Sequence, residues 1–260
     1  MQPGAECELY VVTEEGVIAI LELSLTTDSG QIPLKFAVNR MVNLGYAGRD
    51  LASVRAHIKE LEREGIPAPP SVPMFFPVLK ENITTGNHIE VVSEKTSGEA
   101  EFVLLLTENG TYVGVGSDHT DRALESKNML NSKQICPNVL SKEVWDYQDV
   151  KGHWDSILIR SWVRPAPDED EILYQEALLA AILSPPDIIG LVKSKILDGE
   201  HNNLVIFSGT VPVLGGQTIC GSHFHSALID PLLKRSLTCT YEIVKLGYLG
   251  PLAKSHNSDS

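Results

Sequence analysis

The sequence predicts a mainly β protein of the α+β class, in which many short strands are joined by a few helices. Strand-like stretches bounded by Gly, Asn and Pro outnumber the stretches with helical periodicity. The composition agrees with an ordinary globular protein, because 43% of the 260 residues are hydrophobic and 21% are charged. This length is enough for one large domain, or one domain with a small appendage.

The N-terminal residues 8–25 predict a hairpin, because apolar and polar side chains alternate around a turn signal at Glu14-Glu15-Gly16. We therefore expect a small N-terminal β subdomain at residues 1–36. The main domain would occupy residues 37–254 and a polar tail residues 255–260.

The first helix is expected from Asp50 to about Glu64, after a strand-like stretch at residues 37–46. Asp is a residue type that caps helix N-termini, and Gly65 is typical of a helix end. The prolines between residues 67 and 77 then predict an extended connection. Apolar side chains recur on one face of this helix at helical spacing: Leu51, Val54, Ile58 and Leu61.

The second half of the chain contains a further hairpin, with strands at residues 102–106 and 111–115 around Glu108-Asn109-Gly110. Residues 174–183 predict a second helix, which Pro185-Pro186 would end. More strands are expected at residues 204–207 and 240–246.

The charge balance argues against nucleic acid and anionic membranes as partners, because 21 Lys and Arg against 34 Asp and Glu give a net charge of −13. No stretch approaches the ~20 apolar residues of a membrane span, and the first residues lack the features of a secretory signal. The cysteines are widely spaced, which favours reduced thiols. We expect a cytoplasmic protein.

Glu99 and Glu101 place two carboxylates on one face at the start of an apolar strand, since residues i and i+2 of a strand point the same way. A solvated strand end would explain such a pair, and so would a cation held between the two side chains. Asp118, which follows a Gly-rich strand, could supply a third oxygen ligand. Carboxylates without thiolate or imidazole favour Mg²⁺, Mn²⁺ or Ca²⁺ over Zn²⁺. The alternative is a turn whose aspartates, Asp118 and Asp121, cap the next helix.

His57 and Glu60 lie one turn apart on the first predicted helix, so the carboxylate could orient the imidazole as a general base. A partly buried histidine beside a solvated glutamate is the alternative. Cys220, His223 and His225 could form a zinc cluster, but no fourth ligand lies nearby in the sequence, which favours structural histidines. Phosphate-binding and dinucleotide-binding loops are absent from the sequence.

In chain order these motifs resemble the fumarylacetoacetate hydrolase-like superfamily, over about residues 37–249. The segments similar to those of that family are Asn43 to Tyr46, His57-x-x-Glu60 and its following prolines, Glu99-Ala100-Glu101, Ser117 to Arg122, Ser132-Lys133, and Ser208-Gly209-Thr210 with Gly215-Gly216. An uncharacterised branch of the superfamily fits best. Three features differ from the hydrolases. Glu125 stands where they often have Gln, the proline after Thr210 is displaced to Pro212, and residues 134–136, which follow Lys133, are not the usual ones.

The resemblance implies a β-rich mixed-sheet roll with a small N-terminal β domain, assembled as a homodimer. It also implies Mg²⁺, or Mn²⁺ or Ca²⁺, bound by Glu99, Glu101 and Asp118. The roles that it implies for other side chains are general-base catalysis by His57 with Glu60, stabilisation of an oxyanion by Lys133, and substrate binding by Arg122, Thr210 and Glu125.

The activity implied is metal-dependent hydrolysis of a C–C bond in a β-diketone or acylpyruvate-like small acid, through a metal-stabilised enolate. Decarboxylation, isomerisation or dehydration through the same enolate is the alternative reaction. A non-catalytic binder of small carboxylic or dicarbonyl molecules is the alternative from another class.

Overall fold

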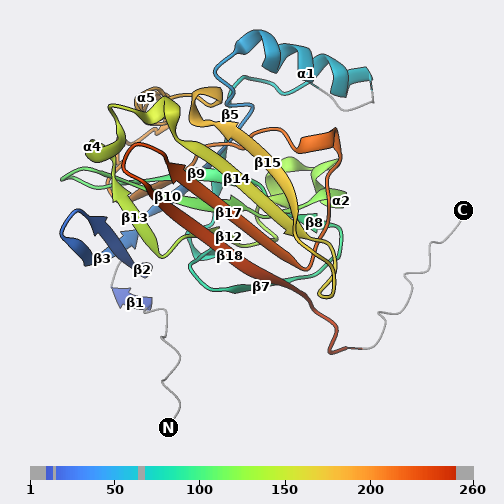
Figure 1. The fold of residues 1–260 in the computed structure, drawn as a ribbon, viewed down its shortest axis with the longest axis horizontal. Coiled ribbons are helices and arrows are strands. Elements are labelled where there is room, and N and C mark those ends of the chain that lie inside the picture. The colour runs from blue at the N-terminus through green and yellow to red at the C-terminus, as the bar shows by residue number, and fades with distance from the viewer. Residues whose placement is uncertain (1–9, 14–15, 64–67, 250–260) are drawn as a thin grey trace, which may run out of the picture.

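The computed structural model describes residues 10–13, 16–63 and 68–249, and two large sheets form most of it (Figure 1). The larger sheet has 11 strands and the smaller has five, while β8 (Thr96–Ser97) and β11 (Thr120–Asp121) form a separate pair. The mainly β class is confirmed. Within the described ranges, no helix has the length and apolar character needed to span a membrane.

The 11-stranded sheet contains β1 (Tyr10–Thr13), β2 (Gly16–Thr27), β3 (Gly30–Val38), β4 (Arg40–Gly45), β5 (Met74–Val78), β6 (Ile83–Thr84), β9 (Ala100–Leu106), β10 (Thr111–Asp118), β12 (Asn138–Leu140), β13 (Glu143–Asp146) and β16 (Leu204–Phe207). The five-stranded sheet contains β7 (His88–Val91), β14 (Leu158–Arg164), β15 (Ile172–Leu178), β17 (His223–Asp230) and β18 (Arg235–Lys245). The α-helices are α1 (Leu51–Arg63), α2 (Arg122–Glu125), α3 (Met129–Ser132), α4 (Tyr147–Val150) and α5 (Pro185–Lys195), and the 3₁₀ turns are η1 (Lys80–Asn82), η2 (Trp154–Ser156), η3 (Leu179–Ala181) and η4 (Leu214–Gly216).

Strand β9 runs through the middle of the molecule and is buried on both faces, which explains its continuous apolar run. Phe102 and Leu104 belong to the core shared with the five-stranded sheet, where they join Ile159 and Leu228. Their neighbours Val103 and Leu105 point the other way, into a second core formed with side chains of β2 and β3. The predicted hairpin between β9 and β10 is confirmed, with Thr111 opposite Leu106.

The predicted N-terminal hairpin is also confirmed, because β1 and β2 pair antiparallel. Strand β2 additionally pairs in parallel with β13, so the hairpin shares the large sheet and the second core. The domain boundary after residue 36 stays a prediction, and the predicted tail at residues 255–260 lies outside the described residues.

The first predicted helix is confirmed as α1, and Asp50 caps it by accepting the Ala52 N–H at 3.0 Å. Its predicted stop at Gly65 lies outside the described residues. The proline-rich stretch ends in β5, an edge strand where the proline nitrogen of Pro77 is tolerated.

The second predicted helix, at residues 174–183, is wrong, since the chain forms β15 and then η3. The pairing of β15 with β14 shifts by one residue, so that Tyr174 and Gln175 are both buried in succession. This bulge breaks the alternation typical of a strand and produces spacing that resembles a helix. The two prolines begin α5 instead of ending a helix, with Ser184 as its N-cap.

Candidate metal centre

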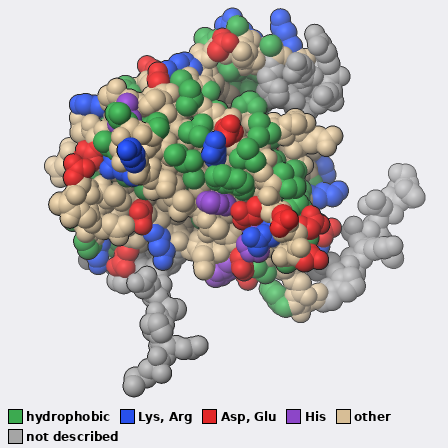
Figure 2. Space-filling view, viewed as in Figure 1, with side chains coloured by type: hydrophobic (Ala, Val, Ile, Leu, Met, Phe, Trp, Pro, Cys, Tyr) green, Lys and Arg blue, Asp and Glu red, His purple; other side chains and the backbone are tan. Residues whose placement is uncertain are grey.

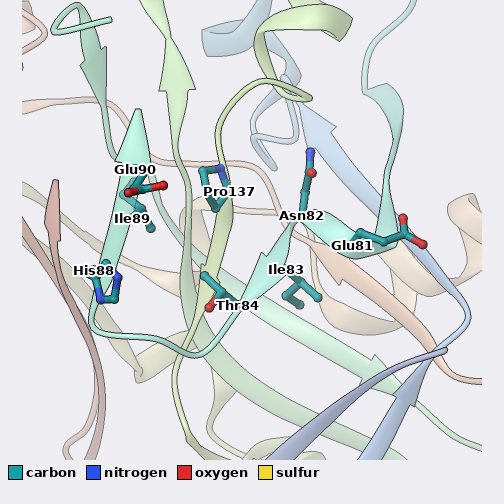
Figure 3. Close-up of a pocket in the computed structure, with 8 residues that line it drawn as sticks. All are labelled: Glu81, Asn82, Ile83, Thr84, His88, Ile89, Glu90 and Pro137. Carbon is teal, nitrogen blue, oxygen red and sulfur yellow. The ribbon is translucent and has the colours of Figure 1, made fainter. Parts of the chain in front are cut away.

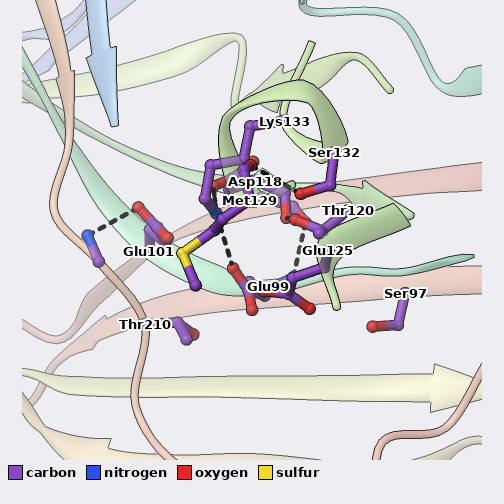
Figure 4. Close-up of polar contacts among 12 residues, drawn as sticks. Ser97, Glu99, Glu101, Asp118, Thr120, Glu125, Met129, Ser132, Lys133 and Thr210 are labelled. Atoms are coloured by element: carbon purple, nitrogen blue, oxygen red, sulfur yellow. Dashed lines mark hydrogen bonds and ion pairs between the residues drawn. The ribbon is translucent and has the colours of Figure 1, made fainter. Parts of the chain in front are cut away.

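The carboxylates of Glu99, Glu101 and Asp118 converge where β9 begins and β10 ends (Figure 4). One oxygen from each carboxylate lies within 4.8 Å of one oxygen from each of the other two. Glu101 is paired with Gly116 across the hairpin, and the Asp118 N–H donates to the Glu99 carbonyl at 3.2 Å. The hairpin register therefore brings residues from both ends of a 20-residue segment together. This is the acidic triad that the sequence predicts.

The donor atoms of the triad fit a divalent cation. The Gly209 N–H donates to Glu101 Oε2 at 2.8 Å, but Glu101 Oε1 has no hydrogen-bond partner, and neither has Asp118 Oδ1. Both oxygens are fully buried, and an unpaired buried acceptor is costly unless something occupies the space beside it. Carboxylate oxygens in this number are the ligands that Mg²⁺, Mn²⁺ and Ca²⁺ prefer. Residues Glu99, Glu101 and Asp118 can thus hold such an ion.

Two cations, Lys133 and Arg122, pair with the carboxylates. The Lys133 ammonium donates to Asp118 and lies 3.6 Å from Glu99 Oε2, and it is almost completely buried at the end of α3. Arg122 Nη1 donates to Glu99 at 2.8 Å and to Glu125 at 2.9 Å, so one nitrogen joins both carboxylates. Its Nε donates to Ser97 at 2.7 Å. The predicted residues Lys133, Arg122 and Glu125 are therefore all in this cluster.

The pKa values of the carboxyls diverge within the cluster. Burial, followed by the charges of Asp118 and Glu99, raises the pKa of Glu101 well above its ordinary value. Burial also raises the pKa of Asp118, although Lys133 opposes this shift. Burial acts in the same direction on Glu99, but Arg122 and Lys133 outweigh it and lower its pKa to about 2. Without a metal ion, Glu101 is thus the carboxyl that keeps a proton most readily.

Gly209 must be a glycine for two reasons. Its φ of +83° lies in the left-handed region, and a Cβ at this position would approach the Leu44 carbonyl oxygen to 3.2 Å. This conformation aims the Gly209 N–H at Glu101.

Gln175 is a positioning residue that the sequence interpretation missed, because it lies in the segment assigned to a helix. Its buried amide accepts from the Ala100 N–H at 3.0 Å and donates to Thr210 Oγ1 at 2.8 Å and to the Val211 carbonyl at 2.6 Å. The Thr210 hydroxyl in turn donates to the Ala100 carbonyl at 2.8 Å. Gln175 therefore fixes the loop containing Gly209 against the start of β9, and the predicted substrate ligand Thr210 is part of that scaffold.

Asn43 and Tyr46, at the end of β4, are further residues near the centre. Asn43 is fully buried, and its amide lies close enough to Asp118 to help hold down the pKa of that carboxyl. Tyr46 is half-buried, and its pKa is raised by burial and then by the charge of Glu125, while Lys133 opposes the shift. The stretch from Asn43 to Tyr46 is one of the segments that resemble the fumarylacetoacetate hydrolase-like superfamily, and this similarity could have identified both residues from the sequence.

His119 follows Asp118 but faces a different set of partners. Its Nδ1 lies 3.0 Å from the Tyr241 hydroxyl, which donates to Ser117 Oγ at 2.8 Å. Ser117 Oγ also accepts the Glu99 N–H at 3.1 Å. Burial lowers the pKa of His119 to about 3, so this residue is neutral and its chain of hydrogen bonds supports the backbone of Glu99.

His57 and Glu60 both lie on α1, but their side chains are outside the described part of the chain. The predicted dyad therefore stays a prediction. Cys220, His223 and His225 do not form a zinc cluster. Among the described residues, the group of three or more side chains that could hold a metal ion is the triad of Glu99, Glu101 and Asp118. His223 pairs with Glu242 at 3.3 Å, and the ring of His225 stacks on Trp162.

A separate surface hollow of about 370 Å³ lies between η1, β6 and β7 (Figure 3). Its lining includes Glu81, His88, Glu90 and Pro137. None of the triad residues lines it, so it is distinct from the carboxylate cluster.

Comparison with known protein families identifies the family of this chain. A family model described as "Protein of unknown function (DUF2848)" matches residues 44–241. No match is found among curated proteins.

Similar solved structures share the fold at low sequence identity. A 2-keto-3-deoxy-D-arabinonate dehydratase complexed with magnesium and 2,5-dioxopentanoate has a TM-score of 0.56 at 16% identity, over 91% of this chain and 94% of the other. A 5-carboxymethyl-2-hydroxymuconate delta-isomerase from Mycobacterium smegmatis has a TM-score of 0.59 at 12% identity, over 91% and 97%. A fumarylacetoacetate hydrolase from Exiguobacterium antarcticum has a TM-score of 0.55 at 13% identity, over 83% and 82%.

Proposed function

Because the chain belongs to the DUF2848 family and has the fold of fumarylacetoacetate hydrolase-like proteins, we propose that it is a metal-dependent enzyme acting on a small oxo acid or dicarbonyl compound. The observation that carries this proposal is the pair of buried, unpartnered oxygens in the triad, Glu101 Oε1 and Asp118 Oδ1. A fold likeness alone would not identify a reaction site.

Glu99, Glu101 and Asp118 would hold the ion, for which Mg²⁺ is our first choice and Mn²⁺ or Ca²⁺ the alternatives. A bound divalent ion would polarise a substrate carbonyl and stabilise negative charge that develops on its oxygen. The similar dehydratase structure contains magnesium, which agrees with this choice.

The protein's own residues would supply orientation and charge. Lys133, buried beside Asp118 and 5.6 Å from the centre of the Phe76 ring, would keep a positive charge next to the developing oxyanion. Gly209 and Gln175 hold Glu101 in place, and Arg122 holds Glu99. His57, oriented by Glu60, would take a proton from the attacking water.

The reaction that we propose is hydrolysis of a C–C bond in an acylpyruvate-like acid. In this reaction a water oxygen joins the acyl carbon while the bond to the neighbouring carbon breaks and its electrons stay on that carbon as the enolate of pyruvate. The enolate carbon then takes up the proton that His57 removed from the water, giving a carboxylic acid and pyruvate. Turnover of acetylpyruvate in ¹⁸O-water with Mg²⁺ should place one label in the released acetate, and His57→Ala should abolish it. Failure of the wild-type protein to cleave any acylpyruvate would contradict this reaction.

Dehydration, isomerisation or decarboxylation is the second candidate, because the similar structures include a dehydratase and an isomerase as well as a hydrolase. Mass analysis of the organic product separates these reactions, since decarboxylation removes CO₂ from the substrate, dehydration removes the elements of water, and isomerisation leaves the mass unchanged. A binder without turnover would retain ligand affinity and give no product.

We also propose that the protein is a cytoplasmic homodimer. Hydrophobic side chains gather over β14, β15 and β17 (Figure 2). Ile172, Leu173 and Leu178 of β15 are among the exposed large hydrophobic residues, and an apolar sheet face of this kind favours contact with a second copy. Cys136, Cys220 and Cys239 are free thiols, as expected in a reducing compartment.

A further inference from the structure

A buried asparagine on β12 lies directly beside one of the three carboxylates. Asn138 is paired with Asp118 in the antiparallel register of β12 and β10, and both side chains are fully buried. The Ser141 N–H donates to the Val115 carbonyl at 2.8 Å, which makes those two residues a hydrogen-bonded pair. Because the two kinds of pair alternate along an antiparallel ladder, Asn138 and Asp118 form a non-hydrogen-bonded pair. The side chains of such a pair project from the same face, with Cβ atoms about 4.5–5.5 Å apart.

Asn138 also shares this face of the sheet with Glu101. Leu140, two residues after Asn138, and Val103, two residues after Glu101, both belong to the core formed with β2 and β3. Because alternate residues of a strand share a face, Asn138 and Glu101 project to that same side. The ligand oxygens of Glu101 and Asp118 lie within 4.8 Å of each other. The Asn138 amide is therefore aimed at the space that these carboxylates enclose.

The amide of Asn138 has no partner in the protein. Its Nδ2 and Oδ1 are both buried without a hydrogen bond, as are Glu101 Oε1 and Asp118 Oδ1. Leaving a buried polar atom unpaired is costly, and native structures contain few such atoms. Four of them on three neighbouring side chains indicate a bound group that all three residues contact.

The charge of the cluster favours a neutral side chain as the next ligand. Four carboxylates and two cations make up the cluster, namely Glu99, Glu101, Asp118 and Glu125 with Arg122 and Lys133. Two negative charges remain when all four carboxylates are ionised, and one divalent ion balances them. Hard divalent cations bind six or more oxygen atoms, and an amide oxygen adds a ligand without adding charge.

We infer that Asn138 is a fourth protein ligand of the cation at the triad and binds it through its amide oxygen, Oδ1. The inference rests on the proposed function, because it takes a divalent cation at Glu99, Glu101 and Asp118 as given. It adds an uncharged ligand from a third strand, β12, to the carboxylates beside β9 and β10.

Asn138→Leu separates a ligand from a structural residue, because it replaces the amide by an apolar side chain of similar size. Calorimetry with the full chain should show an Mg²⁺ affinity at least about tenfold lower than that of wild type. In EDTA the same variant should melt at the wild-type temperature or higher, because it removes a buried amide that has no partner in the metal-free protein. The matched control is Asn39→Leu, since Asn39 is exposed before β4 and its amide donates to the Asn202 carbonyl at 3.4 Å. This control should leave Mg²⁺ affinity unchanged.

A second variant, Asn138→Asp, keeps an oxygen ligand and adds a negative charge. It should retain Mg²⁺ binding and melt earlier than wild type in EDTA, and it decides the question if Asn138→Leu does not fold. Unchanged Mg²⁺ affinity in Asn138→Leu, a lower melting temperature of that variant in EDTA, or lost binding in Asn138→Asp overturns the inference alone. Absence of Mg²⁺ binding by the wild-type protein would instead contradict the proposed function, and the inference with it.

Discussion

Replacing Lys133 by methionine would remove the cation that compensates the buried carboxylates in the metal-free protein. Its ammonium contacts the fully buried Asp118 and lies 3.6 Å from Glu99, while its own side chain is only 5% exposed. Removing one partner from such a buried pair costs about 3–5 kcal/mol in the free energy of unfolding. For a chain of this length that corresponds to a melting temperature lower by roughly 6–10 °C.

Thermal unfolding in EDTA and in saturating Mg²⁺ measures this effect. In EDTA, we expect Lys133→Met to show the full loss at pH 7. Mg²⁺ should reduce the difference from wild type by at least half, because the ion replaces the missing positive charge. The control is Lys35→Met, which removes an exposed ion pair with Glu22 and should cost no more than about 1 kcal/mol. Equal melting of Lys133→Met and wild type in EDTA, or a difference that Mg²⁺ leaves unchanged, would refute the reasoning.

Three further predictions concern the proton, the scaffold and the assembly. The raised pKa of Glu101 means that the folded, metal-free protein binds the proton of this carboxyl more tightly than the unfolded chain does. The stability gained from this proton is complete below the ordinary carboxyl pKa and is lost as pH rises through the raised value. Mg²⁺ affinity should therefore increase with pH, with about one proton released per ion in calorimetry across several buffers; a pH-independent affinity would argue against this. Gln175→Leu should lower the free energy of unfolding by about 2–4 kcal/mol in urea titrations and weaken Mg²⁺ binding, and wild-type values for both would count against its scaffold role. Light scattering should give twice the 28.4 kDa chain mass and Leu178→Asp should give monomers, whereas a monomeric wild-type protein would exclude the dimer.

The triad was predictable because its geometry depends on local features of the sequence. Glu99 and Glu101 lie two residues apart at a strand start, and the turn around Asn109-Gly110 sets the hairpin register. Once Leu106 pairs with Thr111, counting back along both strands brings Glu101 opposite Gly116 and Glu99 next to Asp118.

The scaffold around the triad was less predictable because it depends on distant contacts. Gln175 reaches β9 through a bulge that gives its strand helix-like spacing, and no local signal distinguishes the two. The engagement of Arg122 by Glu125 was also missed, although the two lie three residues apart, because the resemblance directed attention to a substrate role. A salt bridge of this kind depends on side-chain placement that spacing alone does not specify.

The most direct test of the central claim is Mg²⁺ or Mn²⁺ binding by wild type and Asp118→Asn. We expect calorimetry to show one ion per chain for wild type and an affinity at least about 100-fold lower for Asp118→Asn. Asp118→Asn removes one carboxylate from a cluster that holds more carboxylates than cations, and Lys133 keeps Glu99 as a partner at 3.6 Å. The variant should therefore remain folded in EDTA and lose less stability than Lys133→Met. Unchanged metal affinity in Asp118→Asn, or no binding by the wild-type protein, would contradict the assignment of Glu99, Glu101 and Asp118 as a metal centre.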